Sequence, residues 1–297
     1  MSATIVIAGA TGNLGGRIVS SLRRHGAAVC ALVRSGTDSA KPSKLAHPNV
    51  KVVSVDMSNV PDLTQACAGA SCVVSALQGL REVIVDAQSL LLEAANAAGV
   101  PRFIPSDYSI DFTRLLKGEN RNLDWRRTFH ECLDKASIAA TSIFNGAFTE
   151  LLTSRMPLLD FDAKRVRYWG NADQRMDFTS MDDTAAFTAA AALDSSCPRF
   201  LRIAGDQISA RELAYVASEV TKAKFELVQL GSLDELSALI QRDRAADPES
   251  EKNPYPRWQS NQYMHNMFAG RAKLEPLDND RYPNIKWRSA RDVIAAR

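Results

Sequence analysis

Short apolar runs alternate with amphipathic stretches along the first half of the chain. Thr4–Ala8 is rich in β-branched residues, which is typical of a buried parallel strand. In the next stretch, residues 13–25, Leu14, Ile18 and Leu22 recur at every fourth position, the spacing of one helix face. The alternation predicts further strands at 27–33, 50–56, 71–77, from 102 and at 140–146, and helices at 59–67, 83–98 and 122–136. This order builds an α/β fold with a doubly wound parallel sheet, covered by helices on both faces.

The pattern changes after Gly146. It predicts helices at 148–155, 181–193, 209–221, 232–244 and 289–296, and strands at 164–169, 200–203 and 225–230. We therefore expect a nucleotide-binding domain at 1–146, to which 181–203 returns, and a smaller C-terminal α/β substrate lobe at 147–180 and 204–297. The polar, proline-bearing segment Ala245–Pro256 cannot bury a core of its own and is interpreted as a mobile loop or lid.

Three glycines separate the first strand from the first helix. In this position Gly9 permits a sharp turn, Gly12 lets the backbone approach a pyrophosphate, and Gly15 lets the helix pack on the sheet. The helix N-terminus would direct its free N–H groups and positive dipole end at the phosphates. The alternative is a glycine-rich turn that binds nothing. The turn residues expected to bind a dinucleotide in a Rossmann-type fold are Gly9, Thr11, Gly12, Asn13, Leu14 and Gly15.

Further candidates follow the next strands at the carboxyl edge of the predicted sheet, where ligands bind in such folds. Arg34 ends the second strand, and a cation at that tip suits the 2′-phosphate of NADP better than the free hydroxyl of NAD. The alternative is a solvated arginine. Asp56 is expected beside the adenine, and Ser75, Ala76 and Leu77 beside the ribose and pyrophosphate.

Composition excludes several other classes of function. The formal net charge of the 297 residues is +2, without basic runs, which argues against nucleic-acid binding. No apolar run has the length of a membrane span, and the first strand leaves no room for a targeting peptide, so we expect a cytoplasmic protein. The five cysteines show no metal-ligand spacing and are expected to be reduced, and no metal site is predicted.

The segments GATGNLGGRIV, LVR, VPRFIPSDYS, ATSIFNGAF and MDFTSMDDTAAFT resemble the NmrA-like and isoflavone-reductase-like branch of the atypical short-chain dehydrogenases. The resemblance runs over nearly the whole chain. It implies an NADP-binding Rossmann domain and a small substrate lobe. Members of this branch include NADPH-dependent reductases of aromatic compounds and regulators that bind the dinucleotide without turning it over.

The chain departs from the reductase pattern at one position. Related reductases carry a lysine on the helix before the sixth strand, and counting back from ATSIF places Thr128 there. Lys135 lies about two helical turns away, roughly 10 Å. The Tyr-x-x-x-Lys pair of short-chain dehydrogenases is also absent, because Phe112 stands four residues after Tyr108.

The remaining catalytic candidate is Tyr108, which follows the fifth strand beside Asp107 and could donate a proton to a carbonyl oxygen. The alternative is that this segment only caps a turn. Asn145, with Phe148 nearby, is expected near the nicotinamide, although Phe148 also fits a core position. His130 flanks an apolar helix stripe and suits a structural role better than a catalytic one. Arg126 and Arg127 suit either an anionic substrate or a solvated helix face.

Two functions follow from these residues. The first is an NADP(H)-dependent oxidoreductase that transfers hydride to a small carbonyl or conjugated, aromatic substrate. The second is a non-catalytic NADP(H)-binding redox sensor, which the missing lysine favours. We expect the protein to bind a small-molecule substrate and to bind neither nucleic acid nor membranes. Whether it forms a homo-oligomer or binds a regulatory protein stays open. The sequence does not identify the substrate.

Overall fold

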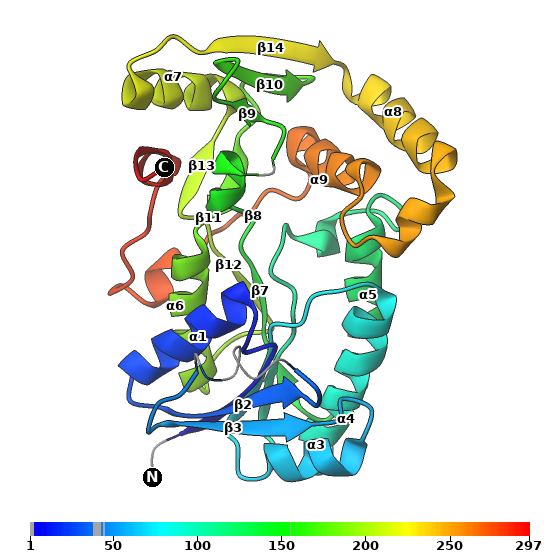
Figure 1. Cartoon of the computed structure of the whole chain (residues 1–297), viewed down its shortest axis with the longest axis vertical. Helices are drawn as coiled ribbons and strands as arrows, with labels where there is room; N and C mark the ends of the chain where they lie inside the picture. The colour runs from blue at the N-terminus through cyan, green and yellow to red at the C-terminus, as the bar shows by residue number, and fades with distance from the viewer. Residues whose placement is uncertain (1–2, 38–42, 44, 155) are drawn as a thin grey trace. The chain divides into compact units, whose positions relative to one another are not determined.

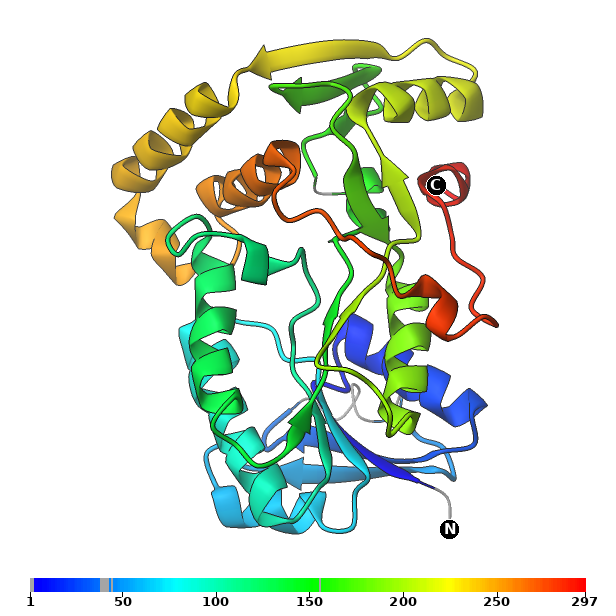
Figure 2. The same ribbon diagram turned by 180° about the vertical axis from the view of Figure 1, so that it is seen from behind.

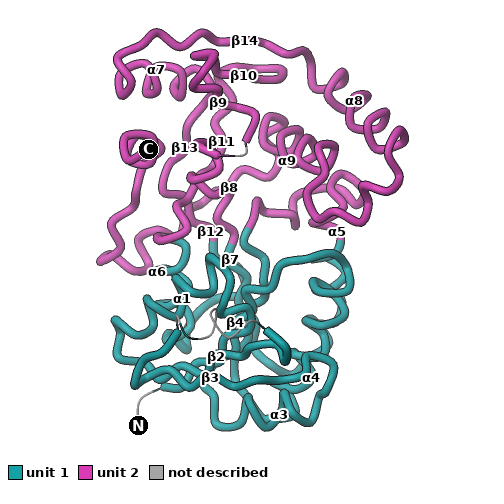
Figure 3. Tube along the Cα trace, in the orientation of Figure 1, with its two compact units in different colours: residues 1–108, 125–143, 184–201 teal, residues 109–124, 144–183, 202–297 magenta. Residues whose placement is uncertain are grey.

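The computed structural model describes residues 3–297 except 38–42, 44 and 155. The chain divides into two compact units, each about half of it (Figure 3). Unit 1 comprises residues 1–108, 125–143 and 184–201, and unit 2 comprises 109–124, 144–183 and 202–297. The assignment of functions to these parts of the chain stays a prediction. It gives nucleotide binding to residues 1–146 and substrate binding to residues 147–180 and 204–297.

Unit 1 is built on a six-stranded parallel sheet with the order β3-β2-β1-β4-β5-β6 (Figure 1). The strands are β1 Thr4–Ala8, β2 Ala28–Arg34, β3 Val50–Val55, β4 Cys72–Ser75, β5 Arg102–Ile104 and β6 Ala139–Ala140. The order reverses between β1 and β4, as in doubly wound dinucleotide-binding folds. The predicted fold class is confirmed.

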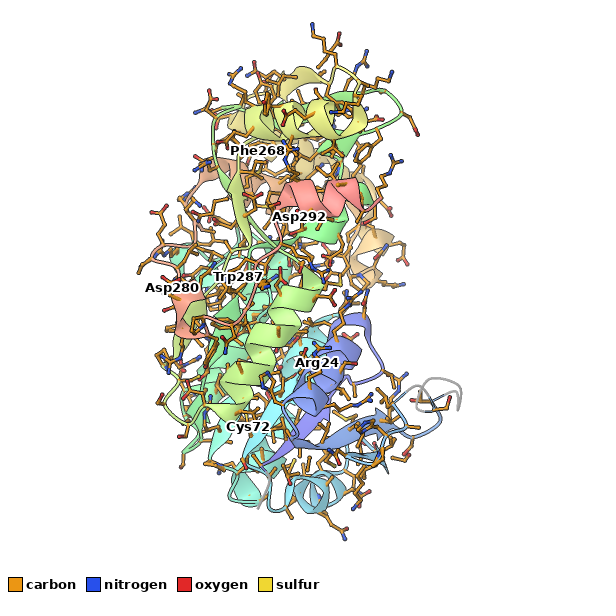
Figure 4. All side chains as sticks on the ribbon, turned by 90° about the vertical axis from the view of Figure 1, so that its left-hand side faces the viewer. Arg24, Cys72, Phe268, Asp280, Trp287 and Asp292 are labelled. Atoms are coloured by element: carbon orange, nitrogen blue, oxygen red, sulfur yellow. The ribbon has the colours of Figure 1, made fainter. Side chains whose placement is uncertain are left out.

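Helices cover both faces of this sheet (Figures 1 and 2). Alternate residues of β1, such as Val6 and Ala8, pack with Leu63, Leu91 and Phe129 of the helices on one face. The helices are α1 Asn13–Arg24, α3 Val60–Cys67, α4 Gln88–Ala97, α5 Arg121–Leu133 and α6 Met181–Leu193, and residues Glu82–Ala87 before α4 are π-helical. Figure 4 labels Cys72 on β4 and Arg24 in the last turn of α1, where a cation suits the helix dipole.

The sixth strand differs from the prediction of one strand at 140–146. It is broken at Thr141 into β6 and β7, Ser142–Phe144. The backbone explains the break: the Thr141 N–H donates to Phe103 O of β5, and the next N–H, of Ser142, donates to Arg199 O. β7 therefore pairs with β12, Phe200–Arg202, instead of extending the large sheet.

Unit 2 contains two three-stranded sheets, β14-β10-β9 and β13-β11-β8. Its strands are β8 Ala147–Phe148, β9 Leu159–Asp160, β10 Arg165–Trp169, β11 Met176–Thr179, β13 Asp206–Ile208 and β14 Glu226–Gly231. Its helices are α7 Ala210–Thr221, α8 Leu233–Ala246, α9 Arg257–Ala269 and α10 Ala290–Ala295, with 3₁₀ turns at Phe112–Arg114, Thr149–Thr153, Pro248–Lys252 and Asn279–Arg281.

Two expectations for unit 2 need correction. The helix expected at 148–155 is a single 3₁₀ turn, and Arg155 lies outside the described residues. The segment from 245 to 256, expected to be mobile, continues α8 to Ala246 and then forms a 3₁₀ turn that Arg121 holds through its guanidinium. The helix α9 was not predicted.

Candidate functional site

The glycine turn between β1 and α1 leaves very little space around two of its three glycines. Gly9 has φ +83°, and a Cβ atom there would lie 2.5 Å from Ala76 O. A Cβ atom at Gly15 would lie 2.1 Å from Gly9 O. Both contacts are with backbone atoms and are far too short, so the fold itself requires glycine at these two positions.

Gly12 is different because a Cβ atom there would make a tight contact rather than a collision. Its φ of −77° and ψ of 168° suit any residue, and a Cβ atom would come no closer than 3.2 Å to Gly9 O. Gly12 N donates to Gly9 O at 3.0 Å, which fixes the turn. The absence of a side chain at Gly12 leaves the backbone open on the outer side of the turn.

The N-terminus of α1 has the properties of an anion site. Gly12 is its N-cap, no side chain caps the helix, and its first turn contains no acidic residue. The N–H groups and positive dipole end are therefore not compensated by α1's own side chains. Asn13 Oδ1 is turned along the helix, accepting from Arg17 Nε at 2.9 Å, and Leu14 follows it. A hollow of about 310 Å³, whose lining includes Thr11, Gly12, Gly16 and Arg23, lies beside the turn.

The other predicted residues of unit 1 lie at strand ends, as expected from the sheet. Arg34 is the exposed last residue of β2, and its carbonyl accepts from Thr37 Oγ1 at 2.6 Å. Asp56 follows β3 and is exposed. Hydrogen bonds from the Ser58 hydroxyl and N–H hold the pKa of Asp56 below its usual range. The carboxylate is therefore an anion with its nearest donors on its own loop.

Ser75, Ala76 and Leu77 end β4 directly beside the glycine turn. Ala76 N donates to Ala8 O at 2.8 Å, and Leu77 O accepts from Ser106 Oγ at 2.7 Å. The Ser75 hydroxyl is buried and has no hydrogen-bond partner among the described residues. A buried hydroxyl without a partner costs stability, so a ligand atom that bonds to it would recover that cost.

Tyr108 closes the turn after β5 and is almost completely buried, at 8% exposure. Burial raises the pKa of its phenol, and the Tyr108 hydroxyl has no hydrogen-bond partner among the described residues. The phenol is therefore protonated at neutral pH and has a proton to donate. Because the side chain is buried, its neighbours must move locally before a substrate atom can contact the hydroxyl.

The turn after β5 also carries a buried hydrogen-bonded pair. Asp107 Oδ2 lies 2.7 Å from His130 Nε2 of α5. Burial alone would raise the pKa of Asp107, but His130, Ser142 and Arg126 outweigh it, so the pKa lies below its usual range. Arg126 is itself buried and donates from Nε to Ser106 O at 3.0 Å. The solvated-face alternative is therefore wrong for Arg126.

The cation that α5 places beside the Ser106–Tyr108 turn is the Arg126 guanidinium and not a lysine. Thr128 is half-buried on the helix and carries no charge. Lys135 is exposed and lies beyond Leu133, the last residue of α5. Arg126 is thus a buried cation beside Ser106–Tyr108, a feature that the sequence pattern did not single out.

Asn145 belongs to unit 2, where it follows β7. Its backbone is fixed, since Asn145 N donates to Ser109 O at 3.0 Å and its carbonyl accepts from Thr179 Oγ1 at 2.7 Å. Its carboxamide is fully buried, and neither Nδ2 nor Oδ1 has a hydrogen-bond partner among the described residues. The Thr149 hydroxyl, which the sequence did not indicate, is unpaired in the same way. Such groups are candidates for ligand contacts.

The described ranges contain neither a metal-binding cluster nor a membrane-spanning helix. No cluster of three or more histidine, cysteine, aspartate or glutamate residues in these ranges could hold a metal ion. None of the helices described combines the length and the apolar character that crossing a bilayer requires. The cytoplasmic location stays a prediction.

A model of the NmrA-like family matches residues 1–270. The chain is 25% identical over 257 residues to bifunctional pinoresinol-lariciresinol reductase 1 of Linum usitatissimum, covering 81% of this chain and 82% of that protein. It is 28% identical over 207 residues to isoflavone reductase homolog IRL of Zea mays, covering 64% of each chain. The family resemblance drawn from the motifs is confirmed.

Solved structures share the fold over almost the full length. The structure of AtPrR2 with NADP+ and (+)pinoresinol superimposes with a TM-score of 0.83 at 22% identity, covering 99% of this chain and 98% of that chain. The binary complex of leucoanthocyanidin reductase and NADPH from Vitis vinifera gives 0.81 at 17% identity and 99% coverage of both chains.

Proposed function

Because the chain belongs to the NmrA-like family, we propose that it is an NADP(H)-dependent reductase of the isoflavone-reductase-like type. The substrate class we propose is a small carbonyl or conjugated, aromatic compound. The curated relatives it matches over four-fifths of its length are named as pinoresinol reductases, which supports an aromatic substrate. The observation that carries the proposal is Gly12, where the fold itself excludes a side chain far less strictly than at Gly9 and Gly15.

The residues at the glycine turn fit a dinucleotide. The uncapped N-terminus of α1 and the bare backbone at Gly12 would hold the pyrophosphate. Ser75 offers an unpaired hydroxyl, and Arg34 offers an exposed cation for a 2′-phosphate. When bound, NADPH supplies the hydride that reduces the substrate. Tyr108, protonated at neutral pH, is the proposed donor of the accompanying proton.

Binding of the cofactor is tested by calorimetric titration of NADPH and NADH. We expect Gly12→Val to abolish NADPH binding while the protein still melts cooperatively, because the new side chain occupies the pyrophosphate position. Arg34→Ala should weaken NADPH binding by about one to two decades, roughly 1.5–3 kcal/mol, and leave NADH binding unchanged. Normal NADPH affinity in a folded Gly12→Val protein would show that the phosphates bind elsewhere.

Catalysis is tested with quinones, aldehydes and phenylpropenes as substrates. Tyr108→Phe should lower turnover at least tenfold with little change in NADPH affinity, because general acids contribute about 10²–10⁴-fold. An unchanged turnover number would remove Tyr108 from the mechanism.

A second candidate is a non-catalytic NADP(H) sensor. Two observations favour it: Thr128 stands where related reductases carry a lysine, and the Tyr108 phenol is buried. NADPH binding by wild-type protein without turnover on any substrate would support the sensor and contradict the reductase.

A further inference from the structure

A buried polar network adjoins the turn that carries Tyr108. His130 is at its centre: Nε2 lies 2.7 Å from Asp107 Oδ2, and Nδ1 lies 3.2 Å from Arg199 Nη2. Arg199 also donates to Ser142 Oγ at 2.7 Å and to Asp134 Oδ1 at 3.0 Å. These residues come from all three stretches of unit 1, and Asp107, His130 and Ser142 are all buried.

The hydrogen bonds assign the proton on the imidazole. A guanidinium can only donate, so His130 Nδ1 must accept from Arg199. The ring is then neutral with its proton on Nε2, which donates to the Asp107 carboxylate. The ring stacks on Phe200 in this orientation.

The same geometry argues against a hydrolytic relay of serine, histidine and aspartate. Such a relay needs the carboxylate on one ring nitrogen and the hydroxyl on the other. Here Ser142 Oγ is 3.4 Å from Nε2, the nitrogen that already faces Asp107, and Nδ1 faces a cation. His130 is therefore placed to hold neighbouring groups rather than to move a proton.

Two arginines lie around the His130–Asp107 pair. Arg126 of α5 and Arg199, which precedes β12, are the cations facing the pair, and Asp134, which follows α5, offsets Arg199 at the surface. Asp107 is the single carboxylate in contact with the ring among these groups. A second proton on His130 would sit on Nδ1 and oppose the Arg199 guanidinium directly.

We propose that His130 is a positioning residue that acts as a neutral link between Arg199 and Asp107 and thereby fixes the turn Ser106–Tyr108. Four other hydrogen bonds hold the same turn. Asp107 N donates to Pro105 O at 2.9 Å and Ser106 N to Gln88 Oε1 at 2.9 Å, while Ser106 O accepts from Arg126 Nε and Ser106 Oγ donates to Leu77 O. The proposal deepens the proposed reductase function and rests on it where it concerns turnover. The residues held in place are those that carry the proposed proton donor.

The test compares two substitutions at one position. A glutamine amide can donate to Asp107 and accept from Arg199, as the neutral ring does, whereas phenylalanine keeps the packing on Phe200 and does neither. We expect His130→Phe to lower kcat at least tenfold and to leave the NADPH dissociation constant within twofold. His130→Gln should keep kcat within threefold and leave the pH profile of wild type unchanged. Glu131→Gln, an exposed neighbour on α5, is the control.

Hydrogen exchange of the Ser106 and Asp107 amides gives a readout that needs no turnover. We expect these amides to exchange at least tenfold faster in His130→Phe and near the wild-type rate in His130→Gln. Equal exchange in both variants and wild type would overturn the positioning role. Equal loss of kcat in His130→Gln and His130→Phe, with normal exchange in His130→Gln, would make His130 an acid–base group instead. Absence of turnover in wild type would contradict the reductase function, and exchange would still decide the inference.

Discussion

Two irregular segments of this protein are held in opposite ways. The glycine turn Gly9–Gly15 of unit 1 is fixed by its own backbone, because Gly9 and Gly15 pack against carbonyl groups where any side chain would collide. The segment 247–256 of unit 2, which we call the Arg121-held segment, is fixed by side chains from outside it, chiefly by Arg121. Arg121 donates to the carbonyl oxygens of Glu251, Asn253 and Pro254 at 3.0–3.1 Å.

Further contacts strengthen the Arg121-held segment. Arg121 also donates to Glu251 Oε2 at 2.9 Å, and its guanidinium lies 4.6 Å from the centre of the Trp258 ring. Arg244 lies 4.5 Å from the same ring and donates to Glu251 Oε1 at 2.6 Å. Both guanidinium groups thus combine cation–π contacts with a carboxylate bond.

The difference shows which loops a sequence can predict. A constraint made by glycines three residues apart is visible in the sequence, since the spacing itself is the signal. A constraint made by an arginine 130 residues earlier in the chain has no local signal. The composition of 247–256 therefore predicted mobility, and the structure shows an anchored segment.

The largest expected effect concerns the glycine turn. Gly15→Ala should destabilise the protein by about 3 kcal/mol or more, because its Cβ would meet Gly9 O at 2.1 Å and only the backbone could move away. Gly16→Ala is the matched control: its Cβ would lie 3.5 Å from Ala10 O, an ordinary contact, and alanine favours the helix by up to about 1 kcal/mol. Urea unfolding measures both. Similar stabilities of the two variants would contradict the backbone explanation.

The second-largest expected effect on stability concerns Arg121. Arg121→Met should destabilise the protein by about 2–3 kcal/mol, because the Glu251 and Asn253 carbonyl groups lose their side-chain donor. Pro254 O and the Glu251 carboxylate each lose one of two donors and keep those from Asn122 and Arg244. The Ser250 and Asn253 amides should exchange faster, while the Gly12 amide should not change. Arg242→Met, on an exposed face of α8, should change stability by less than about 0.5 kcal/mol. Unchanged exchange at Ser250 and Asn253 would show that the segment holds itself.

The smallest expected effect is a pH-dependent loss of stability. It should concern the Arg121-held segment and not the glycine turn. Burial alone raises the pKa of Glu251, but Arg121 and Arg244 outweigh it and the net pKa lies below its usual range. The stabilisation is therefore complete above the unfolded pKa, about 4.3, and is lost as pH falls through the lower folded value. Because the side chain is 38% exposed, we expect under about 1 kcal/mol.

This pH effect is measured as the stability difference between wild type and Glu251→Gln at pH 6 and at pH 3.5. The difference should shrink at the lower pH. The glycine turn has no titratable side chain, so the exchange of its amides should show no matching change. A difference that is constant with pH would remove the ionic part of the argument.

Helices with a local start signal were predicted almost to the residue. The capping boxes Ser209–Glu212 and Ser232–Glu235 are both formed at the starts of α7 and α8. α9 was missed because it is buried on nearly every side and has no apolar stripe, although Pro256 before it and Gly270 after it, at φ +72°, marked its ends.

The candidate site was predictable where strand order decides it. Arg34, Asp56 and Ser75 lie at the carboxyl ends of β2, β3 and β4 because parallel strands bring those ends to one edge. The partners of His130 were not predictable. Arg199 and Ser142 meet it only because β7 leaves the large sheet to pair with β12, and that change of partner has no residue pattern.

The central place of β1 in the sheet has a consequence for synthesis on the ribosome. β1 is made first, and its residue Ile5 pairs with Val29 on one side and with Cys72 on the other. Once β2 has emerged, the second edge of β1 waits a few seconds for β4 at about 5–20 residues per second. During that interval the nascent chain presents an apolar strand with one open edge, the form in which a strand pairs most readily with a neighbouring chain.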